Sequence, residues 1–339
     1  MRYVSVVEPR DRPRAAVTHR LPGKIMSFRT LSAVRLPILA AALTVAACSD
    51  ITPPLAPSDA SPDVQLRAKV PARPTGTGIG LIGAKTQRTA QPVEYHGGPL
   101  IATTSHVYFI WYGSWIGSTA PQILTDLASS LGGSSYFDAI TRYRNVAGTP
   151  LPNAVQYNGS IDDSYSQGTS LANYHIAMIV GDAIITGSLP PDPEGIYVVF
   201  TSADVDETSG FGTQYCGFRS TTSVNGMVIK TVFVGHPDRV PMKCKPQTVG
   251  PNGNAAADAM ATVLVNEIFN TMLDPEFTGW YDKFGFEPAD KCAWSFGKTY
   301  KTANGARANI ALGGRNYLLQ ELWVPDTGGF CTLDVNATL

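Results

Sequence analysis

Asn266, Glu267 and Asn270 stand at a spacing that could carry out metal chemistry. In a helix that reads H-E-x-x-[HE], the first and fifth residues project from one face and hold a cation. The glutamate after the first ligand takes a proton from metal-bound water. The stretch NEIFN, residues 266–270, has this spacing, but an asparagine stands at each ligand position. Glu287 and Asp290 lie in a later acidic turn and could supply a further carboxylate.

These asparagines favour a degenerate metal site. Zinc selects His, Cys and carboxylate ligands, and a neutral amide oxygen is a poor substitute. We therefore expect the two asparagines to form hydrogen bonds along the helix and Glu267 to be paired or solvated. Two alternatives stay open at this stage. Glu267 could remain a general base, and calcium could bind amide and carboxylate oxygens, since Asp274 and Asp282 also lie close in the sequence.

Two other kinds of site are weaker candidates. A Ser-His-Asp enzyme has histidines available, but the chain contains no G-x-S-x-G elbow. We expect His106 and His175 in the core or at its rim, whereas His96, in YHGG, is either a turn residue or a ligand. Aromatic side chains could line a carbohydrate groove, although core packing is the default for most of them. These aromatics are Trp111, Tyr112, Trp115, Trp280, Tyr281, Trp294 and Trp323.

The helix that carries the candidate site has the clearest pattern in the chain. It is expected over residues 254–273, with Asn254 as the N-cap and Asp258 near the positive end of the helix dipole. An apolar stripe at helical spacing predicts that one face is buried. The stripe consists of Ala256, Met260, Val263, Leu264, Ile268 and Met272.

The other elements predict one mixed-sheet domain. Buried strands are expected at 106–113 and 195–205, a helix at 121–133, and a second helix at 170–187 that could break at Gly181. Residues 223–235 are either an edge strand or a hairpin around Asn225-Gly226, and residues 316–324 form a late strand. Strands and helices alternate early, and a long helix and a disulfide-tied tail follow, which indicates an α/β or α+β fold.

The N-terminal region predicts export and lipid attachment. We interpret residues 1–47 as a signal peptide, with Met26 as a candidate true start, because a basic segment precedes twelve mostly apolar residues that lead to Cys48. Twelve residues span about 18 Å as a helix, which is too short for a bilayer core. The VAAC ending resembles the bacterial lipobox, which implies lipidation of Cys48. In such lipoproteins, an Asp directly after the lipidated Cys retains the protein at the inner membrane. Ser49 stands at that position here, which favours the outer membrane or cell surface.

The sequence after residue 47 divides into two parts. Residues 48–92 are rich in proline and glycine and predict a tether that holds residues 93–339, the expected folded domain, away from the membrane. Residues 1–47 carry eight basic and two acidic residues, so the remaining 18 basic and 25 acidic residues give a net charge of −7. This charge argues against a nucleic-acid binder, because no basic stripe is available to displace phosphate counterions.

Four further cysteines predict two disulfides in an oxidising compartment. Cys216, Cys244, Cys292 and Cys331 allow three pairings. We favour Cys216–Cys244 and Cys292–Cys331 because these pairs close the shorter loops. A four-thiolate zinc site is the alternative, but the sequence contains no CxxC pair.

Eight stretches, taken in order, resemble the EXORDIUM or phosphate-induced protein family. They are YHGGPL (95–100), FIWYGSW (109–115), DDSYSQGTSL (162–171), LPPDPEGIYVVFTSADV (189–205), GFGTQYCGFRS (210–220), PNGN…GWYD (251–282), EPADKCAW (287–294) and GGRNYLLQELW (313–323). The resemblance covers nearly all of residues 93–335. It implies a secreted, extracytoplasmic domain, and plant members of the family are associated with growth and cell expansion in the cell wall.

Many members of this family look like AHELAE…EIADKC over the long helix and the later turn. The resemblance implies a cation held at positions matching Asn266, Asn270 and the turn from Glu287 to Asp290. This sequence also departs from the family at CGFR, where Arg219 stands at a position often occupied by His. A permanent positive charge there would oppose a cation.

Two functional hypotheses follow. The first is a lipid-anchored, extracytoplasmic EXORDIUM-like protein that binds without catalysis, with the membrane as one partner and an envelope polysaccharide or peptide as another. No cofactor is expected under this hypothesis. The second is an active hydrolase, directed at peptides or glycans, that uses Glu267 with Glu287 or Asp290, with or without zinc or calcium.

Overall fold

The computed structural model describes residues 91–337. The predicted signal peptide, the predicted lipidation site Cys48 and nearly all of the predicted tether lie outside the described residues. Among the helices of residues 91–337, none is both long enough and apolar enough to cross a membrane.

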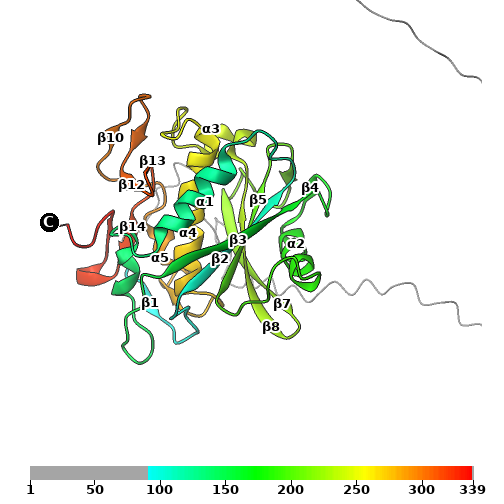
Figure 1. The fold of residues 1–339 in the computed structure, drawn as a ribbon. Helices are drawn as coiled ribbons and strands as arrows, with labels where there is room; N and C mark the ends of the chain where they lie inside the picture. The colour runs from blue at the N-terminus through cyan, green and yellow to red at the C-terminus, as the bar shows by residue number, and fades with distance from the viewer. Residues whose placement is uncertain (1–90, 338–339) are drawn as a thin grey trace, which may run out of the picture. The chain divides into compact units, whose positions relative to one another are not determined.

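A five-stranded mixed sheet forms the centre of the fold (Figure 1). Its order is β3-β2-β5-β8-β7, in which the first four strands are parallel and β7 runs antiparallel to β8. The strands are β2 (Ser105–Tyr112), β3 (Val155–Asp163), β5 (Gly195–Thr201), β7 (Gly217–Val224) and β8 (Met227–Val234). Strand β5 is buried along its whole length, as expected for a parallel strand covered on both faces.

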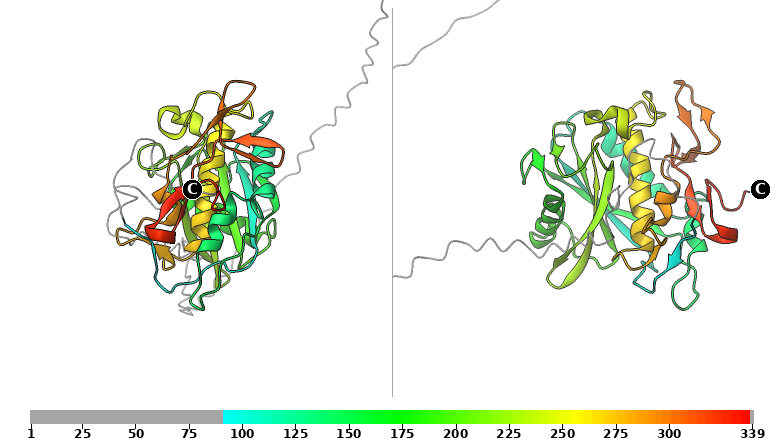
Figure 2. Two further views of the ribbon diagram at one scale, coloured as in Figure 1. Left: turned by 90° about the vertical axis from the view of Figure 1, so that its left-hand side faces the viewer. Right: turned by 180° about the vertical axis from the view of Figure 1, so that it is seen from behind.

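Helices cover both faces of this sheet (Figure 2). Helices α1 (Ala120–Leu131) and α4 (Ala255–Leu273) pack together on one face, and α2 (Asn173–Ile185) packs on the other against β5, β7 and β8. The predicted mixed α/β class is therefore confirmed.

A C-terminal layer covers the side of α4 that faces away from the sheet (Figure 2). It includes α5 (Pro288–Lys291), which contacts both α4 and β14 (Leu322–Val324). The remaining short elements are β1 (Glu94–Tyr95), η2 (Phe137–Arg142), β4 (Ser170–Leu171), β6 (Asp206–Glu207), η3 (Pro237–Arg239), α3 (Pro241–Cys244), β9 (Trp280–Tyr281), β10 (Tyr300–Lys301), β11 (Arg307–Ala308), β12 (Ile310–Leu312), β13 (Arg315–Tyr317), η4 (Asp326–Gly328) and β15 (Phe330–Thr332).

Both disulfides form with the favoured pairing. Cys216, just before β7, is bonded to Cys244 in α3, and Cys292, just after α5, is bonded to Cys331 in β15. The second bond therefore joins the acidic turn to the C-terminal hairpin.

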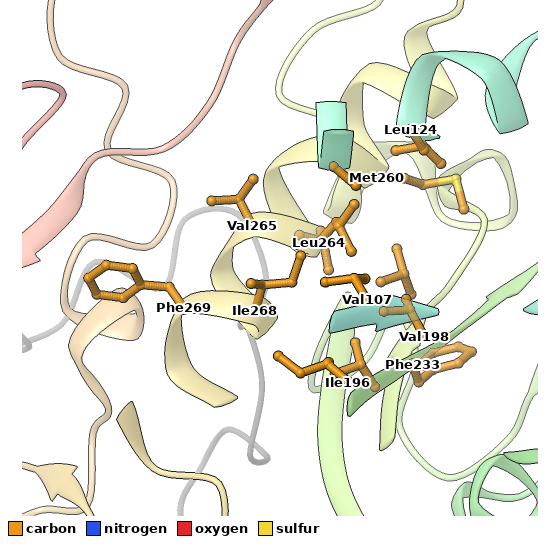
Figure 3. Close-up of a cluster of buried hydrophobic side chains, with 14 of the residues drawn as sticks. Val107, Leu124, Ile196, Val198, Phe233, Met260, Leu264, Val265, Ile268 and Phe269 are labelled. Carbon is orange, nitrogen blue, oxygen red and sulfur yellow. The ribbon is translucent and has the colours of Figure 1, made fainter. Parts of the chain in front are cut away.

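The main hydrophobic core lies between the sheet and α4. Leu264 and Ile268 point toward the strands, whereas Val265 and Phe269 point the opposite way (Figure 3). Every residue of α4 from Ala256 to Leu273 is buried. The predicted apolar stripe is therefore buried, and so is the rest of the helix surface, because the C-terminal layer covers the face that the pattern left open.

Local signals for caps and turns were reliable. Oδ1 of Asn254 accepts the backbone N–H of Ala257 at 3.0 Å, which confirms the predicted N-cap of α4. The predicted hairpin is confirmed, since residues 223–234 belong to the β7–β8 hairpin. Asn225 and Gly226 adopt φ values of 51° and 79°, as a type I′ turn requires at both central positions.

Two predicted elements differ from the structure. The helix expected at 170–187 begins only at Asn173, after β4, and it continues through Gly181 without a break. The strand expected at 316–324 is instead two short strands, β13 and β14, which pair in separate hairpins. The side chain of Asn309 binds both the N–H and the carbonyl oxygen of Leu319, so these backbone groups do not pair with a neighbouring strand.

Candidate functional site

Helix α4 carries three of the predicted site positions into the interior. Asn266, Glu267 and Asn270 are each fully buried in the second half of the helix. Because α4 lies between the sheet and the C-terminal layer, its different sides meet different neighbours. None of the three side chains is therefore exposed to solvent.

Arg219 joins two buried carboxylates. From β7, its Nε donates to Oε2 of Glu287 at 3.2 Å, and its Nη2 donates to Oδ2 of Asp274 at 3.2 Å. Nη2 also donates to Oε1 of Glu287, and Nη1 donates to the carbonyl oxygen of Asp274. All three side chains are at most 2% exposed. We call Arg219, Glu287 and Asp274 the arginine clamp; its planar donors match the geometry of carboxylates.

Asn270 connects α4 with the acidic turn. Its Oδ1 accepts the backbone N–H of Ala289 at 2.8 Å, and its Nδ2 donates to Oδ1 of Asp290 at 3.2 Å. The N–H of Ala289 lies in the first turn of α5 and has no partner within that helix, so Asn270 caps α5 from a neighbouring element. Glu287 immediately precedes α5, and Asp290 lies within it. The structure therefore brings Asn270 and the predicted acidic turn together, with Arg219 bound to the same turn.

Asn266 and Glu267 point to different sides of α4, because successive helix residues are about 100° apart. A Cβ built on Gly217 of β7 would lie 3.5 Å from Oε1 of Glu267, which places this carboxylate against the sheet. One turn before Asn266, the hydroxyl of Thr262 accepts the backbone N–H of Gln320 at 2.8 Å, so this side of α4 faces the C-terminal layer. Neither polar atom of the Asn266 side chain has a hydrogen-bond partner among residues 91–337.

A second buried ion pair holds the loop before the acidic turn. Nζ of Lys291 lies 2.7 Å from Oδ2 of Asp282 and donates to the carbonyl oxygen of Gln91 at 2.6 Å. Burial lowers the pKa of Lys291, and the contact with Asp282 opposes that shift. Oδ1 of Asp282 accepts the N–H groups of Phe284 and Phe286, both at 2.9 Å. Asp282 therefore organises its loop as a structural carboxylate.

The groups that the metal hypothesis invokes are already engaged by other protein groups. The guanidinium of Arg219 already neutralises Glu287 and Asp274, and the oxygen of Asn270 is used to cap α5. Across residues 91–337, no group of three or more His, Cys, Asp or Glu side chains is arranged to hold a metal ion. The chemistry of this site is that of a buried clamp in which an arginine supplies the positive charge.

The histidines considered as ligands make local structural contacts. His96 stacks on Tyr281 with ring centres 3.6 Å apart, and its Nε2 lies 3.1 Å from the carbonyl oxygen of Tyr281, which favours the turn role. Nδ1 of His106 lies 2.7 Å from Oδ2 of Asp192. Nδ1 of His175 accepts a backbone N–H at the start of α2 at 2.7 Å.

The aromatic residues considered for a carbohydrate groove fall into two groups. Trp111, Tyr112, Trp294 and Trp323 are buried and belong to the core. Trp115, Trp280 and Tyr281 are partly exposed. Trp115 follows the carboxyl end of β2, and the other two form β9.

The sequence patterns did not predict how the charged groups pair. Asp274 was expected only as a calcium ligand, and no role was expected for Lys291. The position of Arg219 in β7 could have indicated the clamp. Successive side chains of a strand point to opposite faces, so Arg219 lies on the same face as Gly217, the face that packs on α4. An arginine on a buried face requires a carboxylate partner.

The fold and the site define an α/β domain with a mixed central sheet and a buried arginine clamp at the end of its central helix. The chain belongs to the family described as the phosphate-induced protein 1 conserved region, which matches residues 93–333. This match confirms the resemblance found in the eight sequence stretches.

Individual relatives agree with this assignment. The chain is 27% identical over 274 residues to Protein EXORDIUM-like 3 of Arabidopsis thaliana, covering 68% of this chain and 80% of the relative. It is 26% identical over 278 residues to Protein EXORDIUM-like 5 of the same plant, covering 69% and 76%. It is 23% identical over 286 residues to Protein PHOSPHATE-INDUCED 1 of Nicotiana tabacum, covering 72% and 88%. The comparison with solved structures gave no match.

Proposed function

We propose that this chain is a lipid-anchored, extracytoplasmic EXORDIUM-like protein whose domain binds an envelope polysaccharide without catalysis. The lipobox-like ending at Cys48 supports the anchor, and Ser49 supports the outer membrane or cell surface. Acyl chains on Cys48 would hold the domain at the membrane, because each buried methylene contributes about 0.8 kcal/mol.

The observation that carries the non-catalytic part of this proposal is the position of Arg219. Its guanidinium is permanently protonated and lies between Glu287 and Asp274. It neutralises these buried carboxylates as a metal ion would. Unlike a metal ion, it offers no open coordination position at which water could be activated.

The burial of Glu267 supports the same conclusion. A general base must come within hydrogen-bond reach of the proton that it removes, directly or through one water. The Glu267 side chain is fully buried between α4 and the sheet. A substrate of the competing hydrolase, which would use Glu267 with Glu287 or Asp290, would therefore have to open the core.

Elemental analysis of the full-length protein tests the loss of metal chemistry. We expect zinc and calcium well below one atom per chain, because the arginine clamp occupies the carboxylates. Stoichiometric zinc in freshly purified protein would falsify the proposal in favour of the hydrolase.

A second test restores the ligands that the family pattern implies. The triple variant Asn266→His/Asn270→Glu/Arg219→His should take up one zinc per chain, because it gains ligands and loses a fixed positive charge. The matched control Asn266→His/Asn270→Glu retains Arg219 and should bind zinc about 10–100-fold more weakly. Circular dichroism shows whether both variants fold. A folded triple variant with no gain over the parent would mean that these positions do not surround one cation site, which refutes the interpretation of a degenerate metal site.

A further inference from the structure

The central sheet changes its direction of growth between β2 and β5. After β2 the chain moves through α1 to β3 on one side, and after β5 it moves to β7 and β8 on the other side. The carboxyl ends of the adjacent parallel strands β2 and β5 therefore lie where the strand order reverses. In open parallel α/β sheets, ligands bind outside the strand ends at such a position.

Polar groups from three loops meet at these strand ends. Oγ of Ser202 accepts the backbone N–H of Ser114 at 3.0 Å and donates to Oδ1 of Asp204 at 2.5 Å. The phenol of Tyr165 donates to Oδ2 of Asp204 at 2.6 Å. The hydrogen bond from Ser202, followed by that from Tyr165, lowers the pKa of Asp204, so this carboxylate is ionised at neutral pH. Asp204 is exposed, and fixed donors orient it.

The backbone of Tyr165 is held in an unusual conformation. Its φ of 64° lies in the left-handed region, which a bulky residue rarely adopts. Strain of this kind persists where the surrounding structure demands it, and it is common at binding sites. Here it accompanies a phenol that reaches from the loop after β3 to Asp204 in the loop after β5.

An aromatic residue, Trp115, directly follows Ser114, whose backbone N–H binds Ser202 of this group. Trp115 is partly exposed and packs edge-on against Trp111, with ring centres 5.4 Å apart. The ring of His236, in the loop after β8, lies 5.9 Å from the ring of Trp115. Burial lowers the pKa of His236, so its imidazole is neutral near neutral pH. Ile116, next to Trp115, is 97% exposed, so this loop stands at the surface.

We propose that this carboxyl edge of the sheet, centred on Trp115 and Asp204, binds a saccharide unit of the envelope polysaccharide. A pyranose ring presents a face of C–H groups that packs on an aromatic ring, while its hydroxyls donate to a carboxylate. The edge offers both partners on loops that are joined through Ser114 and Ser202, and Tyr165 and Ser202 fix the carboxylate. This inference rests on the proposed binding function and adds the place and chemistry of recognition.

The charges at this edge favour a neutral glycan. Arg239 is a cation in this cluster, and its Nη2 pairs with Oδ1 of Asp206 at 3.1 Å. Its Nη1 donates to the carbonyl oxygen of Ala203 at 3.2 Å. An anionic polymer would therefore meet the ionised Asp204 while the nearby guanidinium is engaged elsewhere.

Binding of the full-length protein to solid polysaccharides tests the site. The probes are cellulose, xylan, chitin and purified peptidoglycan sacculi, and bound protein is measured as a function of concentration. Trp115→Ala and Asp204→Asn should each weaken binding by about tenfold or more. The controls are Phe284→Ala, which removes an aromatic ring that is 52% exposed, and Asp326→Asn, which neutralises another exposed carboxylate. Both controls should bind as the parent does.

The outcomes separate this inference from the proposed function. If the parent binds a probe and only the two site variants lose affinity while remaining folded, both stand. If the parent binds and the site variants bind equally well, the saccharide site lies elsewhere and this inference is overturned, but the binding function remains. If the folded parent binds none of the four probes, polysaccharide binding is rejected, and the inference that rests on it is rejected too.

Discussion

Replacing Arg219 measures how much the arginine clamp contributes to the stability of the domain. In Arg219→Met the side chain keeps most of its length, but Glu287 and Asp274 remain in a site that is at most 2% exposed. Removing one partner of a buried ion pair costs about 3–5 kcal/mol, because an uncompensated charge stays behind. A domain of about 250 residues loses about 2–4 °C of Tm per kcal/mol, so Tm should fall by about 6–20 °C.

Guanidinium unfolding, followed by tryptophan fluorescence and circular dichroism, measures this loss. The matched variant Arg219→Met/Glu287→Gln/Asp274→Asn removes the entire set of charges. It should recover much of the stability, because neutral groups of similar volume replace a buried ion cluster at far smaller cost. Arg219→Lys retains the charge without the planar fork and should fall between the parent and Arg219→Met.

Two results would refute this reasoning. A loss below about 1 kcal/mol in Arg219→Met would place the clamp among exposed ion pairs, whose contributions are that small. A neutralised triple variant no more stable than Arg219→Met would show that the packing of the arginine, and not its charge, sets the cost. Both comparisons require unchanged m-values, since a changed m-value indicates an altered unfolded or native state.

The remaining predictions concern pH and covalent cross-links. Burial raises the pKa of Asp258 to about 6, above its unfolded value of about 3.9, so its contribution to stability is present below about pH 4 and is lost as the pH rises through about 6. The free energy of unfolding should fall by at most about 3 kcal/mol over this pH range. Asp258→Asn should abolish this pH dependence, measured as the urea midpoint at each pH. Parallel profiles for parent and variant would contradict this. Replacing Cys292 and Cys331 by Ala removes a cross-link between residues 39 positions apart. The free energy of unfolding should fall by about 2–4 kcal/mol, measured by denaturant titration against the oxidised parent. An unchanged unfolding midpoint would refute this prediction.

Several parts of the fold were predictable because their signals are local. The cap at Asn254 and the turn at Asn225-Gly226 depend on residues only a few positions apart, so the sequence contains the whole interaction. The late strand was mispredicted for the opposite reason. Its interruption depends on the side chain of Asn309, which lies ten positions before Leu319 and binds its backbone.

The candidate site shows the same division between local and distant information. The family resemblance indicated Arg219, Asn270 and the acidic turn as positions of one candidate site, and the structure brings these residues together. Their actual partners were not predictable. Arg219 and Glu287 are separated by 68 positions, and nothing in either local pattern identifies the other.

The sequence by itself determined the helix at 254–273, the two early buried strands, the family, and the asparagines at the two helix positions that the resemblance implies as ligands. Only the tertiary structure decided that α4 is buried on every side and that a guanidinium neutralises the carboxylates beside it. The physical reason is that periodicity within a helix records which residues are apolar, whereas the burial of its polar face depends on a layer contributed by later residues. Whether a buried carboxylate meets a metal or an arginine is fixed by which distant side chain the fold brings to it.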